Sequence, residues 1–144
     1  MARTYTYSFE DTTVNINHPQ YGNYSAYGSG IGTVTVSYAN DISAHDVASD
    51  LTVVVSKIAK MNGTVTFSIL QSSDFNNYLK KLVAYLRQAP TEEWAKATVE
   101  ISNRSTGDTY VCAGVSPQKI PDNAYTDQAG TRDWAWLVAN ISYE

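Results

Sequence analysis

Alternation of apolar and hydroxyl residues recurs along this chain and constrains its possible folds more than any other feature. The clearest segments are GTVTVSY (32–38), GTVTFSIL (63–70) and KATVEISN (96–103). Successive side chains of a β-strand point to opposite faces, so each segment places apolar residues on one face and mainly Thr or Ser on the other. The pattern predicts strands that each have one face on a hydrophobic core.

Four further strands are expected at YSFEDTTVNIN (7–17), DLTVVVSKI (50–58), DTYVCAGV (108–115) and RDWAWLVANISYE (132–144). Alternation in the second of these places Leu51, Val53 and Val55 on one face, which is expected to meet the core, opposite Thr52, Val54 and Ser56. The last is apolar on both faces and is expected to be covered on both sides. Gly107 predicts a hairpin turn, and the Gly- and Tyr-rich stretch 21–32 predicts a loop.

One amphipathic helix is predicted among the strands. Its apolar stripe consists of Phe75, Tyr78, Leu79, Leu82, Val83 and Leu86. Ser72 or Ser73 can cap its first turn, and Pro90 prevents its continuation. About seven strands with one flanking helix indicate a mainly β, α+β domain with a β-sandwich or barrel-like fold. The length suits a single domain over residues 1–144.

Composition argues against several classes of protein. The net charge of -4 argues against a nucleic-acid-binding surface, which needs clustered Lys and Arg. A single cysteine, Cys112, cannot form an internal disulfide, which favours synthesis in a reducing cytoplasm. No apolar run reaches the ~20 residues of a membrane helix, and the N-terminus lacks the apolar core of a signal peptide. No membrane partner is therefore expected.

Catalytic and metal-ligating patterns are not found, so we expect neither an enzyme nor a cofactor. His18 and His45 are far apart with no Cys or carboxylate at metal-ligand spacing, and we interpret them as surface or loop histidines. Asp41, Asp46 and Asp50 lack the spacing of a calcium loop and indicate an exposed acidic loop.

The aromatic residues permit a second interpretation. Trp134 and Trp136 share one strand face, and together with Trp94 they could form a platform that stacks on sugars. Aromatic residues on a strand beside a helix are more often core or interface, which is the favoured interpretation. Cys112 lies in an alternating strand and is expected in the core.

The hydroxyl faces have two possible explanations at this stage. An ordinary solvent-exposed face mixes Lys and Glu, whereas these faces carry almost no charge. Thr has a high strand propensity, which accounts for the pattern without any function. Alternatively, an uncharged hydroxyl face suits burial against another subunit or the wall of a water-filled channel.

On these segments the chain resembles phage tail tube proteins, in particular the small tube subunits of long contractile-tailed phages and prophages. The resemblance rests on the order of YSFEDTTVNI, YGSGIGTVTVSY, LTVVVSKIAKMNGTVTFSILQSSDFNNYL and DWAWLVANISYE. It implies a structural virion protein of the tail, made in the host cytoplasm. It also implies hexameric rings that stack into a tube, forming the channel for DNA ejection.

The same resemblance implies partners and contact sites. The partners would be further copies of the chain and the tail sheath, baseplate and tail terminator proteins, while DNA passes without specific binding. The loop from Ala39 to Asp50 is too long for a tight hairpin. It is expected to contact the next ring through Asp41, His45, Asp46 and Asp50.

A channel wall is expected from the hydroxyl faces. The inner sheet would consist of segments 32–38, 50–58, 96–103 and 108–115. Segment 63–70 has the same alternation, and the resemblance alone places it outside. The residues expected to face the lumen are Thr33, Thr35, Ser37, Thr52, Ser56, Thr98, Glu100 and Ser102. The alternatives are the tube protein of a type VI secretion system or contractile bacteriocin, a carbohydrate-binding β-sandwich module, and a small hydrolase without a recognisable site.

Overall fold

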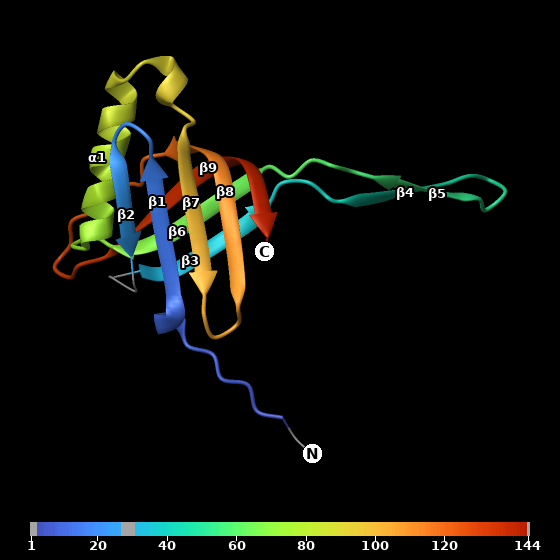
Figure 1. Ribbon diagram of the computed structural model, residues 1–144, viewed down its shortest axis with the longest axis horizontal. Helices are drawn as coiled ribbons and strands as arrows, with labels where there is room; N and C mark the ends of the chain where they lie inside the picture. The colour runs from blue at the N-terminus through green and yellow to red at the C-terminus, as the bar shows by residue number, and fades with distance from the viewer. Residues whose placement is uncertain (1–2, 27–30, 144) are drawn as a thin grey trace.

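The computed structural model describes residues 3–26 and 31–143, and it has a mainly β fold with one α-helix (Figure 1). The strands are β1 (Thr12–His18), β2 (Gly22–Ala26), β3 (Ile31–Tyr38), β4 (Ser43–Val47), β5 (Val53–Lys57), β6 (Gly63–Leu70), β7 (Ala97–Asn103), β8 (Asp108–Lys119) and β9 (Thr131–Tyr143). The helices are α1 (Asp74–Gln88) and two short 3-10 helices, η1 (Phe9–Asp11) and η2 (Thr91–Glu93). The predicted mainly β class with one α-helix is confirmed, with nine strands in place of about seven.

Seven strands form one antiparallel sheet in the order β2-β1-β7-β8-β9-β6-β3. The other two, β4 and β5, pair with each other in a hairpin that projects far from the body (Figure 1). We call residues 42–58 of this projection the arm. Within the described ranges, β2 and β3 are the open edges of the large sheet.

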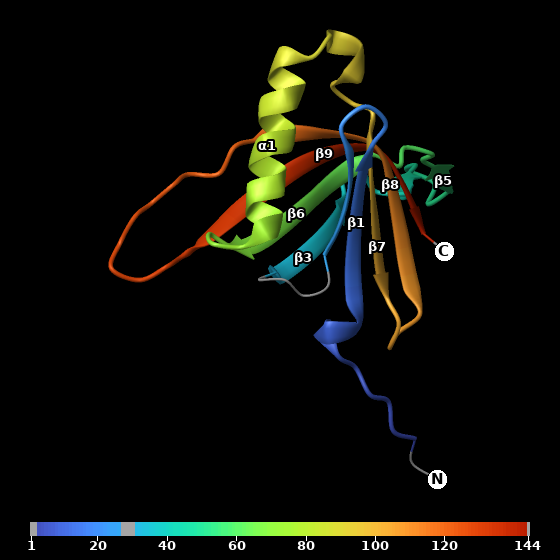
Figure 2. The same cartoon turned by 60° about the vertical axis from the view of Figure 1, so that its left-hand side comes forward.

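The sheet bends sharply between its two halves. β8 has an extra residue relative to β7, because Ala97 pairs with Val115 while Val99 pairs with Cys112. Gly114, in the bulge, has φ 66°, and a Cβ there would lie 2.6 Å from Cβ of Ala139. A bulge of this kind increases local twist and bends the strand. The β9–β6–β3 half therefore crosses behind the β2–β1–β7–β8 half (Figures 1 and 2).

The hydrophobic core lies inside the bent sheet, and α1 covers its remaining open side (Figure 2). The apolar stripe of the helix is buried as predicted at Phe75, Leu79, Leu82, Val83 and Leu86, while Tyr78 is half-buried. Ser73 caps the helix by accepting a hydrogen bond from the Phe75 N–H at 3.1 Å. Burial of the stripe therefore fixes the helix against both halves of the sheet.

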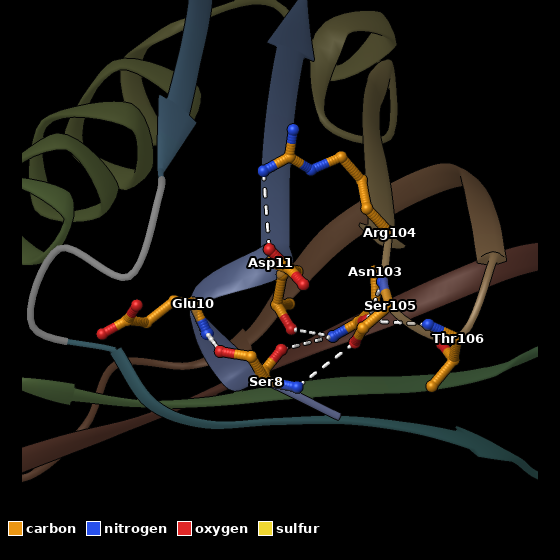
Figure 3. A network of polar contacts seen from close by, with 8 residues as sticks. Ser8, Glu10, Asp11, Asn103, Arg104, Ser105 and Thr106 are labelled. Carbon is orange, nitrogen blue, oxygen red and sulfur yellow. Dashed lines mark hydrogen bonds and ion pairs between the residues drawn. The ribbon is translucent and has the colours of Figure 1, made fainter. Parts of the chain in front are cut away.

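The N-terminal segment is anchored at Ser8 by the β7–β8 turn (Figure 3). The Asn103 side chain donates to the Ser8 carbonyl at 3.3 Å and to Thr12 Oγ1 at 2.7 Å. Its oxygen accepts from the backbone N–H of Ser105 at 2.9 Å and from that of Thr106 at 3.2 Å. Gly107 completes the turn with φ 78°, as predicted.

Three predicted boundaries were wrong. The loop expected at 39–50 contains β4, which pairs with β5, and β5 begins at Val53 and not at Asp50. The first strand begins at Thr12, because Phe9–Asp11 form a 3-10 turn that Ser8 caps. The predicted loop 21–32 contains β2, which pairs with β1, and the start of β3. Pairing with a neighbouring strand outweighed the low strand propensity of its Gly, Asn and Ser residues. Residues 27–30 of that loop lie outside the described ranges.

Within residues 3–26 and 31–143, no helix is both long and apolar enough to cross a lipid bilayer.

Candidate assembly surfaces

An uncharged hydroxyl surface covers the outer side of β3 and β6. Thr33 pairs with Ser68, Thr35 with Thr66 and Ser37 with Thr64. Paired residues of antiparallel strands point to the same side of the sheet. We call these six residues the hydroxyl surface; every one of them is exposed or half-buried.

The position of β6 corrects one prediction. Segment 63–70 was expected outside the sheet that carries Thr33, Thr35 and Ser37, but β6 lies next to β3 in that same sheet. Segment 63–70 has the same alternation as segment 32–38, and this pattern alone groups Thr64, Thr66 and Ser68 with the hydroxyl residues of β3. Placing the segment outside on the basis of the resemblance was wrong.

The other expected lumen residues do not all join this surface. Thr98, Glu100 and Ser102 lie on the outer side of β7, opposite Asn17, Asn15 and Thr13 of β1. They belong to the other half of the bent sheet (Figure 1). Thr52 and Ser56 lie in the arm, outside the seven-stranded sheet.

Segment 50–58 alternates as predicted, yet its apolar side meets no core. Val53 and Val55 are 48% and 61% exposed, because β5 pairs with β4 and not with the large sheet. The expectation that they face the core of the same chain was wrong. Alternation shows which side of a strand is apolar, but it does not show that this side is covered.

The two faces of the arm differ in composition. Its apolar face holds the pairs Val47–Val53 and His45–Val55 and ends in the pair Ser43–Lys57. Its polar face holds Asp46 and Ser56, but their cross-strand partners are Val54 and Ala44, and Val54 is 57% exposed. Two isolated strands are marginally stable in water, and exposed apolar patches of this kind mark interaction sites.

The acidic loop residues lie along the arm. Asp41 precedes β4, His45 and Asp46 lie within it, and Asp50 lies at the tip; all four are exposed as predicted. The carboxylate of Asp50 accepts the backbone N–H of Thr52 at 3.1 Å. This hydrogen bond lowers the pKa of Asp50 and keeps the tip negatively charged.

The base of the arm is tightly held by the body. The Ala39 N–H donates to the Asn62 carbonyl at 3.0 Å, and the Asn40 amide donates to the Asn62 side chain at 2.7 Å. A Cβ on Gly63 would clash with the Ser37 carbonyl and lie 2.7 Å from Cδ1 of Ile141. The projection therefore starts from a well-packed hairpin base.

The outer side of β9 also corrects a prediction. Leu137 is 45% exposed beside Thr64, although this strand was expected to be covered on both sides. Asp133 and Ala135 occupy the positions opposite Ser68 and Thr66. The chain alone thus leaves an apolar residue at the border of the hydroxyl surface.

The two histidines have different environments. His45 is exposed in the arm, as predicted, whereas His18 is only 1% exposed, which corrects its assignment to the surface. Nδ1 of His18 accepts the backbone N–H groups of Gln20 and Tyr21, both at 3.2 Å. Its Nε2 then donates to the Glu93 carbonyl at 3.0 Å, so the ring joins two loops.

The tryptophans of β9 belong to the core and cannot form a sugar platform. Trp134 and Trp136 are almost fully buried with ring centroids 6.1 Å apart. Trp94 lies in a separate, partly exposed loop. Cys112 is buried as predicted, and burial raises the pKa of its thiol to about 11. Among the described residues, no three His, Cys, Asp or Glu side chains gather at a distance suited to a metal ion.

An apolar hollow with a basic rim lies where α1 meets Ile120 and Trp134. Its lining residues are Lys80, Val83, Ala84, Arg87, Ile120 and Trp134. The volume is about 140 Å³, and the lining is mostly apolar. Lys80 and Arg87 belong to no ion pair in the described part of the chain. We call this feature the basic-rimmed hollow.

Comparison with protein families bears directly on these surfaces. A family model, Bacteriophage PhiTE tail tube protein, matches residues 4–144. The chain belongs to this tail tube family. Its role is therefore structural, as a component of a phage tail tube. No curated protein sequence matches the chain.

Solved structures share the fold at low sequence identity. A sheath/tube terminator of the extracellular contractile injection system PVC has TM-score 0.63 and 8% identity, with 99% of each chain covered. The anti-feeding prophage cap has TM-score 0.60 and 8% identity, covering 100% of this chain and 94% of the other. The PVC sheath-tube complex has TM-score 0.59 and 9% identity, covering 97% and 92%. At such identities the likeness concerns the fold alone.

Proposed function

We propose that the chain assembles into hexameric rings that stack into the tail tube, through which DNA is ejected. The family and the shape of the chain support this proposal. Open edges at β2 and β3 leave unpaired backbone groups, and joining edges around a closed ring removes them. The exposed arm supplies the additional contact that stacking requires.

The hydroxyl surface supports the channel most directly and carries the proposal. Thr33, Thr35 and Ser37, with their three partners on β6, present no charge over two full strands. Hydroxyl groups keep such a wall wet, while the absence of Lys and Arg deprives DNA phosphates of binding partners. DNA can then pass without specific binding.

The remaining expected lumen residues take different places in this arrangement. Thr52 and Ser56 would extend the wall from the polar face of the arm. Thr98, Glu100 and Ser102 lie across the bend, and we assign them to the surface away from the channel. Because the sheet bends between its two halves, the outer side of β7 and the outer side of β3 and β6 face different directions and cannot line the same channel wall.

The arm would provide contact between rings. Its apolar face needs a cover that its own chain does not supply, and Asp41, His45, Asp46 and Asp50 are available for polar contacts. A neighbouring copy in the next ring would bury the valines and remove the exposed apolar area.

Other tail proteins are proposed as partners. Structures with this fold come from a PVC sheath-tube complex, a PVC sheath/tube terminator and an anti-feeding prophage baseplate. By analogy, sheath, baseplate and terminator proteins would contact this chain in the virion after synthesis in the host cytoplasm. A tube of a contractile injection system without DNA is the second candidate, favoured by the same structures.

Cysteine labelling of assembled tubes tests the proposal. Thr35→Cys and, separately, Glu100→Cys are made on a Cys112→Ala background, and negative-stain microscopy first verifies rings and tubes. A small thiol reagent should reach position 35 through the bore, whereas a reagent wider than the bore should not. If the wide reagent labels position 35 but not position 100, the assignment is inverted, and the outer side of β7 faces the channel in place of the outer side of β3. Wild-type chains that never form rings or tubes would reject the assembly itself.

A further inference from the structure

The tip of the arm contains a leucine in an unfavourable conformation. Leu51 has φ 70°, and its side chain is 81% exposed. The left-handed region is unfavourable for a residue with a side chain, whereas glycine occupies it readily. The loop between Ala48 and Thr52 has three residues, and its last residue commonly adopts this conformation. The Leu51 N–H donates to the Ala48 carbonyl and the Ala48 N–H donates to the Thr52 carbonyl, both at 2.9 Å. Glycine would serve the free chain better, so a contact made by the leucine side chain offers a reason for its presence.

Asp50, the residue before Leu51, adds a carboxylate to the tip. Asp50 is held by the Thr52 N–H at 3.1 Å, which orients its charge at the tip. No ion pair with Asp50 occurs among the described residues. The tip therefore presents one large apolar side chain next to one uncompensated negative charge.

The basic-rimmed hollow has the complementary chemistry. Val83 and Trp134 contribute apolar lining, and both are nearly buried. Lys80 and Arg87 bring two positive charges to its opening and lack carboxylate partners within the chain as described. An apolar hollow of about 140 Å³ with a positive rim suits one aliphatic side chain beside a carboxylate.

We propose that Leu51 of one copy enters the basic-rimmed hollow of a second copy, with Asp50 paired to Lys80 or Arg87. The inference rests on the proposed assembly and names the receiving surface for the arm. The arm and α1 lie at opposite ends of the long axis (Figure 1). The contact is therefore head-to-tail, which is the kind that builds rings and stacks.

Disulfide crosslinking tests the contact. Leu51→Cys combined with Ala84→Cys, on a Cys112→Ala background, is oxidised in assembled tubes. Ala84 is an exposed residue of the hollow, so a ladder of covalent oligomers is expected on a non-reducing gel. The matched control, Leu51→Cys with Ser25→Cys, places the second thiol on exposed β2 and should give no ladder.

Three substitutions test the contact without disturbing the core. Leu51→Gly relieves the backbone strain, so its melting temperature should equal or exceed that of the wild type. Its critical concentration for assembly should nevertheless rise at least about tenfold, equivalent to ~1.4 kcal/mol. Asp50→Lys and Arg87→Glu should each impair assembly, and the double variant should recover it.

The outcomes distinguish this contact from the wider proposal. Wild-type tubes with no ladder from the 51–84 pair, or full assembly by Leu51→Gly, would overturn the contact and leave the tube intact. Tubes without a ladder are also expected if the hollow binds a different tail protein, and that outcome likewise overturns the contact. If wild-type chains form no rings or tubes, the proposed function fails and the contact fails with it.

Discussion

The indole N–H of Trp134 donates to the side-chain oxygen of Asn76 at 2.9 Å, and both side chains are buried. The Asn76 amide in turn donates to the Gln71 carbonyl at 3.1 Å. One asparagine thereby joins β9, α1 and the loop before the helix. Buried polar groups are costly unless they are paired, so this amide stabilises the helix–sheet contact.

Asn76→Ala should lower the free energy of unfolding by about 1–3 kcal/mol, because it leaves a buried indole N–H without an acceptor. The neighbouring Asn77 is exposed, and Asn77→Ala should change stability by less than about 0.5 kcal/mol. Urea unfolding followed by tryptophan fluorescence measures both. Equal stability of the two variants would show that the hydrogen bond contributes nothing.

Gly63→Ala should destabilise the base of the arm. The added methyl group would clash with the Ser37 carbonyl and crowd Ile141, so the β3–β6 pairing must shift. A loss of about 1–3 kcal/mol is expected, as for other overpacked sites. Gly107→Ala, where a Cβ meets nothing within 4 Å, isolates the cost of a positive φ from that of crowding. Thermal unfolding compares them, and a smaller loss at position 63 than at position 107 would contradict the crowding argument.

Alkaline pH should weaken the fold through Tyr78. Burial, and secondarily the nearby Tyr21, raises the pKa of Tyr78 to about 12 from its usual 10. The neutral phenol is favoured in the folded state, so its contribution is complete below pH ~10 and is lost as pH rises towards ~12. After allowance for solvent screening, the loss is on the order of 1 kcal/mol.

Tyr78→Phe should reduce this alkaline decline in the free energy of unfolding. The variant also loses the hydrogen bond from the Tyr78 hydroxyl to the Gly22 carbonyl, at 3.3 Å, so the comparison concerns the slope with pH and not the absolute stability. Identical slopes for the two chains between pH 10 and 12 would contradict the assignment.

Removal of the arm should separate folding from assembly. Residues 41–60 are replaced by a two-residue Asn-Gly turn, which joins the β3–β6 hairpin at its base. No residue of the arm contributes to the hydrophobic core, so the melting temperature should stay within a few degrees of the wild type. Long tubes should not form in negative-stain images, whereas the control Ser43→Ala should polymerise normally. Normal tubes from the shortened chain would exclude the arm from assembly.

Local patterns in the sequence determined the secondary structure well where each element has one buried face. The period-two alternation of β6 and β7 and the apolar stripe of α1 are confirmed, while β3 follows its alternation at Val34 and Val36 but leaves Tyr38 41% exposed. The pattern was weaker for β2, whose Gly, Asn and Ser residues form a strand because β1 offers an edge to pair with. Likewise, His18 is buried because two loops close around it, and no local signal records such a closure.

The tertiary structure alone decided which alternating strands share a surface. Alternation states which side of a strand carries the hydroxyl groups, and for β3 that side is the exposed one. Alternation does not show that β6 lies beside β3 or that β5 lies outside the large sheet. It also does not show that a bulge at Gly114 bends the sheet, so that β7 faces away from β3 and β6. Side-chain alternation depends on the strand's own geometry, whereas strand order, bends and coverage depend on contacts between residues distant in sequence.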